Sequence, residues 1–255
     1  MVPEADLANV QPAYDGLPGV AAGLLLRGFG PRLHSGYLYG SIARGNAVPG
    51  RSDADLIALL WAPPTAGDRR RARNVERALQ ERFPLLAGAG VGLGDLREVQ
   101  AERYGAQVFL RELSVCVCGE DLRPLLPRTR PSAAAAAAFH RDTPEVFARA
   151  RRELATSTDP DVLRRACRIA SRRLVQAAFA VVMARDGVWA TVLEDQAAIV
   201  GEAVPRWREA ARRAAEQGRR PVAEPDVVAE LLETLGRWAE DALAELAERE
   251  RPAGS

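Results

Sequence analysis

Lysine is absent from the 255-residue chain, so all 35 of its basic residues are arginines. This absence excludes lysine chemistry, such as Schiff-base formation. It also means that a cationic side chain that contacts a phosphate must be an arginine, whose planar guanidinium matches phosphate oxygens. The 34 acidic residues leave a formal net charge of only +1. Because this balance provides no overall positive field, we do not expect a nucleic-acid partner.

Cysteines and long apolar runs are also scarce. The three cysteines Cys116, Cys118 and Cys167 are too few for a disulfide framework, and no second Cys or His cluster completes a metal site with them. The apolar run Leu24–Leu26 is too short to cross a membrane. Residues 1–11 lack the basic start and the apolar stretch of a signal peptide. We therefore expect a cytoplasmic protein that makes no membrane contact.

Hydrophobic patterning divides the chain into a mixed half and a helical half. The patterns of the first half predict helices over 18–29 and 69–83, strands over 36–39, 53–61 and 91–96, a helix that ends at 113, and a strand over 114–118. Those of the second half predict a helix that starts at 133 and further helices over 159–186, 191–204, 206–216 and 226–248. The predicted fold class is α+β, with a small mixed sheet and flanking helices followed by a C-terminal helical bundle.

Two acidic residues open the most informative of these strands. The segment Asp53-Ala54-Asp55 leads into an apolar run that predicts a buried strand. Residues two apart in a strand project from the same face, about 6.5 Å apart along the chain. Two carboxylates held this way repel one another, and burying them is costly unless cations neutralise their charge. Magnesium is the expected cation, because it takes oxygen ligands and usually shares them with phosphates.

A glycine–serine pair precedes the two carboxylates. Gly40-Ser41 follows a predicted strand, and a glycine there lets backbone N–H groups approach a phosphate closely. Ser41 adds a hydroxyl donor, and Arg44 adds a guanidinium within one turn. Each fragment alone is also explained by an ordinary turn or a helix cap, but a cap does not account for Asp55 at the start of an apolar strand. Together they predict a site that binds a nucleoside triphosphate with Mg²⁺ and presents its α-phosphorus for in-line attack.

The order of strand, Gly40-Ser41, short loop, Asp53-x-Asp55 and strand resembles the signature of the DNA polymerase β-like nucleotidyltransferase superfamily. Residues 37–56 are most similar to the branch that holds the aminoglycoside nucleotidyltransferases, in which a helical domain follows the catalytic domain. Residues 114–127 resemble the strand and turn that close that catalytic domain, and residues 168–205 resemble the helical domain more loosely. The resemblance implies a nucleotidyltransferase catalytic domain over residues 1–130 and an α-helical domain over residues 131–255.

The resemblance also implies a third carboxylate on a neighbouring strand, which serves as a metal ligand or as the general base. Gly92 stands where that acid is expected. Asp95 is the nearest replacement and is therefore assigned the catalytic role, with Glu98 and Glu112 as further options.

The helical domain supplies further candidates by the same resemblance. Some relatives take their base from this domain, which makes Glu194 and Asp195 candidates. Relatives also place an arginine of the long helix on the triphosphate. We assign this role to Arg172, with Arg168 and Arg173 as alternatives.

The sequence therefore predicts an adenylyltransferase-like enzyme that transfers a nucleoside monophosphate, AMP from ATP, to a hydroxyl of a small molecule. Asp53 and Asp55 hold Mg²⁺ in this prediction, and Gly40, Ser41 and Arg44 hold the β- and γ-phosphates. An aminoglycoside-like antibiotic as acceptor is implied by the resemblance alone. Two alternatives stay open: a nucleotidyltransferase of the toxin–antitoxin type that acts on protein or RNA, and a non-catalytic nucleotide-binding regulator.

Overall fold

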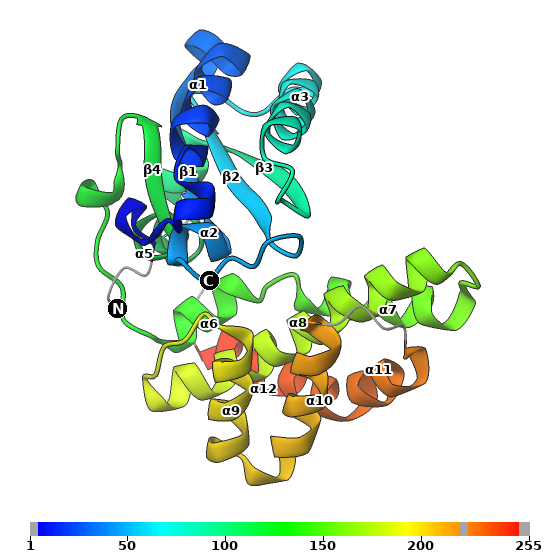
Figure 1. The fold of residues 1–255 in the computed structure, drawn as a ribbon. Helices are drawn as coiled ribbons and strands as arrows, with labels where there is room; N and C mark the ends of the chain where they lie inside the picture. Colours follow the sequence, from blue (N-terminus) through cyan, green and yellow to red (C-terminus); the bar gives the residue numbers. More distant parts are fainter. Residues whose placement is uncertain (1–4, 102, 220–223, 250–255) are drawn as a thin grey trace. The chain divides into compact units, whose positions relative to one another are not determined.

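The computed structural model describes residues 5–101, 103–219 and 224–249 (Figure 1). The chain divides into two compact units, Met1–Thr129 and Arg130–Ser255. The first unit contains a four-stranded sheet, and the second is built from helices. This arrangement confirms the predicted α+β fold class.

The sheet of the first unit is mixed. Its strands are β1 (Leu33–Tyr39), β2 (Asp53–Leu60), β3 (Gly88–Asp95) and β4 (Ser114–Gly119), in the order β3-β2-β1-β4. Strand β1 runs antiparallel to both β2 and β4, whereas β3 runs parallel to β2. The parallel pair is joined by a helix, as a crossover between parallel strands requires.

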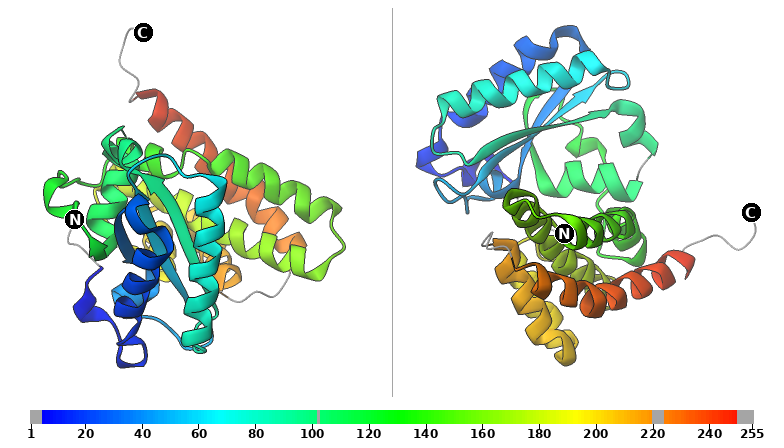
Figure 2. Two further views of the ribbon diagram at one scale, coloured as in Figure 1. Left: turned by 90° about the horizontal axis from the view of Figure 1, so that it is seen from above. Right: turned by 90° about the vertical axis from the view of Figure 1, so that its right-hand side faces the viewer.

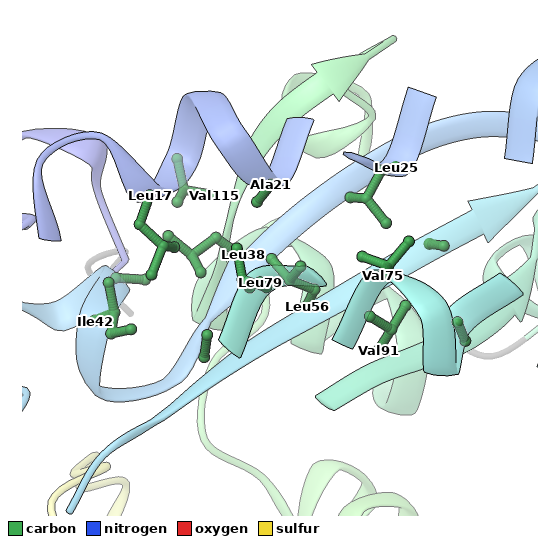
Figure 3. Packing of buried hydrophobic residues seen from close by; sticks show 14 of the residues in the cluster. Leu17, Ala21, Leu25, Leu38, Ile42, Leu56, Val75, Leu79, Val91 and Val115 are labelled. Carbon is green, nitrogen blue, oxygen red and sulfur yellow. The ribbon is translucent and has the colours of Figure 1, made fainter. Parts of the chain in front are cut away.

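Helices cover both faces of this sheet. The helices of the first unit are α1 (Leu17–Phe29), α2 (Gly40–Arg44), α3 (Ala66–Arg82), α4 (Leu96–Ala101) and α5 (Val108–Leu113). Helices α1 and α3 lie on one face in all three views (Figures 1 and 2). They bury a large apolar cluster in which Leu25, Val75 and Leu79 meet the strand residues Leu38 and Leu56 (Figure 3). A smaller cluster on the other face includes Tyr37, Leu59, Val99 and Leu110.

The second unit is centred on one long helix. Its helices are α6 (Ala133–Phe139), α7 (Thr143–Thr156), α8 (Pro160–Asp186), α9 (Leu193–Ala203), α10 (Arg208–Arg219), α11 (Pro225–Leu231) and α12 (Arg237–Arg249). Helix α8 packs against all the others, and its stripe of buried small and apolar side chains explains why. Asp159 caps its start, and Gly187 ends it in a left-handed conformation. Among the described residues, no helix is both long and apolar enough to span a membrane.

Two strands and one helix are among the elements that differ from their predicted extents. Strand β1 begins at Leu33, earlier than predicted, because the polar side chains of His34 and Ser35 bond to each other at 2.8 Å inside the protein. Strand β3 begins at Gly88, since its glycines alternate with Ala89, Val91 and Leu93, which pack on the core. The helix predicted over 226–248 is interrupted by a π-helical segment, Leu232–Gly236, between α11 and α12.

Candidate active site

The carboxylates of Asp53 and Asp55 lie on the same face of β2. The alternate residues Ala54, Leu56 and Ala58 are fully buried in the core under α1 and α3. The two acids therefore project from the opposite face, where both are only half-buried. The strand periodicity that predicted a shared face is thus present in the structure.

The Asp55 carboxylate lies against the turn that follows β1. Tyr39, the last residue of β1, pairs with Asp55 across the sheet. Gly40 comes next with a φ of 76°, and a Cβ built on it would overlap Oδ2 of Asp55. A side chain at Gly40 is thus excluded both by the left-handed backbone and by the carboxylate. The structure brings the glycine–serine turn and this carboxylate together.

Helix α2 starts directly at this turn. Ser41 lies in its first turn and Arg44 in its last, and both side chains are half-buried. The N-cap residue Tyr39 provides no side-chain hydrogen bond to the first turn of this helix. Gly45 ends the helix with a φ of 77°.

Tyr39 is a neighbour of the carboxylates that the sequence did not point to. Burial, and then the negative charge of Asp55, raise the pKa of Tyr39 to about 12. Its ring meets the ring of Phe109, from α5, edge-on with centroids 4.9 Å apart. The phenol is therefore neutral at physiological pH and lies near the Asp55 carboxylate. Only the pairing of Tyr39 with Asp55 across the sheet reveals that Tyr39 is a neighbour of this carboxylate.

The loop between α2 and β2 is fixed by hydrogen bonds at both of its ends. The backbone N–H of Val48 donates to Oγ of Ser52 at 2.8 Å, and the N–H of Gly50 donates to the carbonyl of Leu85 at 2.7 Å. The N–H of Ala87 donates to the carbonyl of Ser52 at 3.0 Å, so the pairing continues into β2 and β3. This short, tied loop sets the position of Asp53.

The Asp53 carboxylate faces a second glycine. A Cβ built on Gly88, its partner in β3, would lie 2.9 Å from Oδ1 of Asp53. Asp53 forms no ion pair with any residue that the structure describes. Two half-buried carboxylates on one face are suitable oxygen ligands for Mg²⁺, with phosphate oxygens and water supplying the rest of the shell. Within the described ranges, no three His, Cys, Asp or Glu side chains gather closely enough to hold a metal ion by themselves.

The strand register contradicts the prediction that Asp95 lies beside these carboxylates. Asp95 pairs with Leu60, five residues along the strand from Asp55, which is about 16 Å. Leu60 faces the core under α1 and α3, and its partner Asp95 projects from that same face. Asp95 therefore lies on the face of the sheet opposite to Asp53 and Asp55. Its Oδ1 accepts the backbone N–H groups of Arg97 and Glu98 and so begins helix α4. Asp95 is a helix cap here.

The other candidate positions of the first unit are Gly92, Glu98 and Glu112, and a catalytic role for either acid stays a prediction. Gly92, which pairs with Ile57, lies on the carboxylate face and is exposed to solvent. Glu98 lies in α4, beyond the end of β3. Glu112, at the end of α5, is only 2% exposed, and its Oε1 has no hydrogen-bond partner among the described residues. The nearest cation recorded for that oxygen is Nε of Arg111, at 3.7 Å.

The candidates from the helical domain all lie in the second unit. Arg172 is exposed on α8, where its side chain packs against Gly218 of α10. Arg173 pairs with Asp142 at 2.9 Å, and Glu194 pairs with Arg219 at the same distance. Arg168 and Asp195 lie on α8 and α9. The proposed contacts of these residues with a triphosphate or an acceptor stay predictions.

Comparison with known proteins gives a structural neighbour. No protein-family model and no curated protein sequence matches the chain. The crystal structure of spectinomycin adenyltransferase AAD(9) from Enterococcus faecialis, with ATP and spectinomycin, matches it with a TM-score of 0.56. The match covers 91% of this chain and 99% of that chain at 13% sequence identity. The chain has a nucleotidyltransferase fold. At this identity the adenyltransferase establishes the fold, and the chemistry must be argued from the site.

Proposed function

We propose that the chain is a magnesium-dependent nucleotidyltransferase that transfers AMP from ATP to a hydroxyl of a small molecule. The acceptor oxygen forms a bond to the α-phosphorus, the bond from that phosphorus to the bridging oxygen of the β-phosphate breaks, and pyrophosphate leaves. The hydroxyl proton passes to a base or to solvent. The observation that carries the proposal is the contact of Asp55 Oδ2 with Gly40, because it joins the carboxylate strand to the glycine–serine turn.

Each residue of this site has a proposed role. Asp53 and Asp55 would hold Mg²⁺, which neutralises charge on the phosphates and orients them when bound. The backbone N–H groups at Gly40, the hydroxyl of Ser41 and the guanidinium of Arg44 would bind the β- and γ-phosphates. Arg172 of the helical unit is proposed as a further phosphate ligand.

An aminoglycoside-like antibiotic is the proposed acceptor. The structural neighbour was crystallised with ATP and spectinomycin, which supports a nucleotide and a hydroxylated small molecule as the two substrates. The experiment that tests the proposal is pyrophosphate release from each of the four ribonucleoside triphosphates with Mg²⁺. Each is incubated with a panel of aminoglycosides, aminocyclitols and neutral polyols. Release from ATP that requires both Mg²⁺ and an acceptor is expected; no release from any combination would contradict the enzyme.

A non-catalytic nucleotide-binding regulator is a second candidate. It is favoured by the lack of a third acid beside Asp53 and Asp55 among the described residues, since Gly92 and Asp95 do not supply one. Calorimetry separates the two functions. A regulator binds ATP with Mg²⁺ but releases no pyrophosphate with any acceptor.

A Gly40→Ala substitution is expected to lower pyrophosphate release by about 10²-fold, because small displacements of reacting groups have effects of that size. The new Cβ would strain a backbone with a φ of 76° and push Oδ2 of Asp55 away from the turn. The matched control is Gly19→Ala in α1, where a new Cβ meets no described residue within 4 Å. Steady-state rates of the two purified variants check the expectation, and equal rates would contradict the role of Gly40.

A further inference from the structure

Arginine is concentrated on one helix of the first unit. The whole chain has 35 basic residues among 255, whereas the 17 residues of α3 include six arginines. These are Arg69, Arg70, Arg71, Arg73, Arg77 and Arg82. A general use of arginine in place of lysine would spread these residues along the chain, so their concentration on α3 needs a cause of its own.

Four of these arginines surround an open hollow. It has a volume of about 470 Å³ and is lined by Gly67, Arg70, Arg71, Arg73, Asn74 and Arg77. Two of the guanidiniums lie over Gly67, whose Cβ position is 3.2 Å from Nη1 of Arg71 and 3.8 Å from Nη2 of Arg70. Among the described residues, the lining thus holds four cations and no acid.

Three of the lining arginines point into solvent without a partner. Arg70, Arg73 and Arg77, which we call the arginine face, follow the helical repeat on the side opposite to the buried Ala72 and Val75. All three are exposed, and none forms an ion pair with any residue that the structure describes. The arginine face is therefore a surface of open positive charge.

The acids of α3 do not neutralise the arginine face. Asp68 is fully buried and pairs with Arg32 and Arg71. Glu76 accepts a backbone N–H of β3 at 2.9 Å. Glu81 is the one exposed acid of the helix, lies near its C-terminal end, and forms no ion pair within the described ranges.

The arginine face is unfavourable for the helix by itself. Arg70 and Arg73 are three residues apart, and Arg73 and Arg77 are four apart, so each pair repels along the helix surface. The N-terminal part of a helix is also the positive end of its dipole, which disfavours further positive charge there. An anionic partner would remove both effects.

A nucleic-acid backbone suits this surface better than a small anion or a lipid. Solvent screens each exposed charge strongly, so a small anion would gain little from it. A nucleic acid instead releases condensed counterions when cations reach several of its phosphates. The arginine face extends about 10 Å, or about three nucleotide steps of a duplex. A lipid surface is disfavoured because α3 exposes no large apolar side chain that could insert.

We propose that the arginine face of α3 binds the phosphate backbone of a nucleic acid. Helix α3 covers the face of the sheet opposite to Asp53 and Asp55, so this surface is separate from the proposed nucleotide site (Figure 2). The inference does not depend on the proposed function. The net charge of +1 conceals the surface, because it averages the arginines of α3 with acids elsewhere in the chain.

Salt-dependent binding to the whole chain tests the proposal. The probes are fluorescent single-stranded RNA, double-stranded RNA and duplex DNA, each of about 20 nucleotides per strand and of mixed sequence. The variant Arg70→Gln/Arg73→Gln/Arg77→Gln is expected to bind about 10²-fold more weakly at about 0.1 M salt. The slope of log Kd against log salt concentration is expected to fall by about 3 for the duplexes and by about 2 for the single strand.

A triple variant of paired arginines is the matched control. Arg149, Arg212 and Arg237 are exposed on helices of the second unit, and each pairs with an acid four residues away. Changing all three to glutamine removes the same charge and is expected to keep the affinity within about twofold. Thermal melting of the α3 variant is expected to be no lower than that of the wild type, because its changes are exposed and relieve repulsion.

Three outcomes would overturn the inference. These are a wild-type chain that binds none of the nucleic acids, an α3 variant that binds as the wild type does, and a control variant that weakens equally. Vesicles of phosphatidylcholine and phosphatidylserine form a further arm, and binding to vesicles alone would assign the surface to lipid and contradict the proposal. Pyrophosphate release is expected to be equal in the α3 variant and the wild type, so failure of this inference and failure of the proposed function are distinguishable.

Discussion

Asp53→Asn and Asp55→Asn variants are each expected to lose pyrophosphate release by about 10²–10³-fold, the usual effect of removing one group that stabilises transition-state charge. Both carboxylates project from the same half-buried face of β2, and Asp55 also contacts Gly40 of the phosphate-binding turn. Asparagine keeps the size of each side chain but removes the negative charge that would hold Mg²⁺. Single-turnover rates at saturating ATP and Mg²⁺ measure the loss.

The control for this pair is Asp15→Asn. Asp15 is an exposed aspartate of the same unit, at the end of a short 3₁₀ helix, and lies outside the site. Its rate is expected to equal that of the wild type. Mn²⁺ binding, measured in the presence of a non-hydrolysable ATP analogue, should weaken in both site variants and remain unchanged in the control. An Asp53→Asn variant with wild-type turnover would contradict the proposed function.

An Asp68→Ala variant is expected to lose about 3 kcal/mol of unfolding free energy, at the low end for breaking a buried ion pair. The Asp68 side chain is fully buried at the start of α3 and pairs with Arg32 at 2.8 Å and Arg71 at 3.1 Å. It also accepts the backbone N–H of Thr65 at 2.9 Å in a capping box. Both arginines are partly exposed, so solvent reduces the cost of leaving them unpaired. Urea denaturation at pH 7 measures the loss.

The contribution of Asp68 also depends on pH. Burial opposes ionisation, but hydrogen bonds from Thr65 and Arg32, with the charge of Arg32, hold the pKa of this carboxyl well below its ordinary value of 3.8. A lowered folded-state pKa means that the stabilisation is complete above 3.8 and is lost as the pH falls toward the folded-state value. The stability difference between the wild type and Asp68→Asn is therefore expected to be constant from pH 7 to 5 and to shrink below 4.

A double-mutant cycle supplies the control for this prediction. If Asp68 acts through Arg32, the Asp68→Ala/Arg32→Met variant is expected to lose less stability than the sum of the two single variants. Additive stability losses in the double variant would show that the pair contributes no more than its packing. A stability difference between the wild type and Asp68→Asn that is the same at pH 5 and pH 3 would show the same.

Features that depend on local periodicity were predictable from the chain. Alternation in a strand is a property of two or three consecutive residues, so Asp53 and Asp55 could be assigned to one face before any fold was known. Apolar spacing predicted α1, α3 and α8 for the same reason.

The pairing of β3 with β2 was decided only by the tertiary structure. These strands are joined through α3, and the register that results depends on how the helix packs on the core. A shift of one residue reverses every side chain between the two faces, so no local pattern could reveal that Asp95 points away from the site. The same register places Gly90, an unremarkable glycine in the sequence, beside Asp55 and opens the space there.

By itself the sequence determined the two carboxylates, the glycine–serine turn and the α+β class, because each follows from short-range geometry. The tertiary structure alone decided what surrounds them. Gly40 lies against Asp55, Tyr39 lies beside it, and β3 presents a glycine, Gly92, where a third acid was expected. These neighbours come from chain segments far apart in sequence. Their contacts depend on strand order and register, which are set by the packing of the whole core.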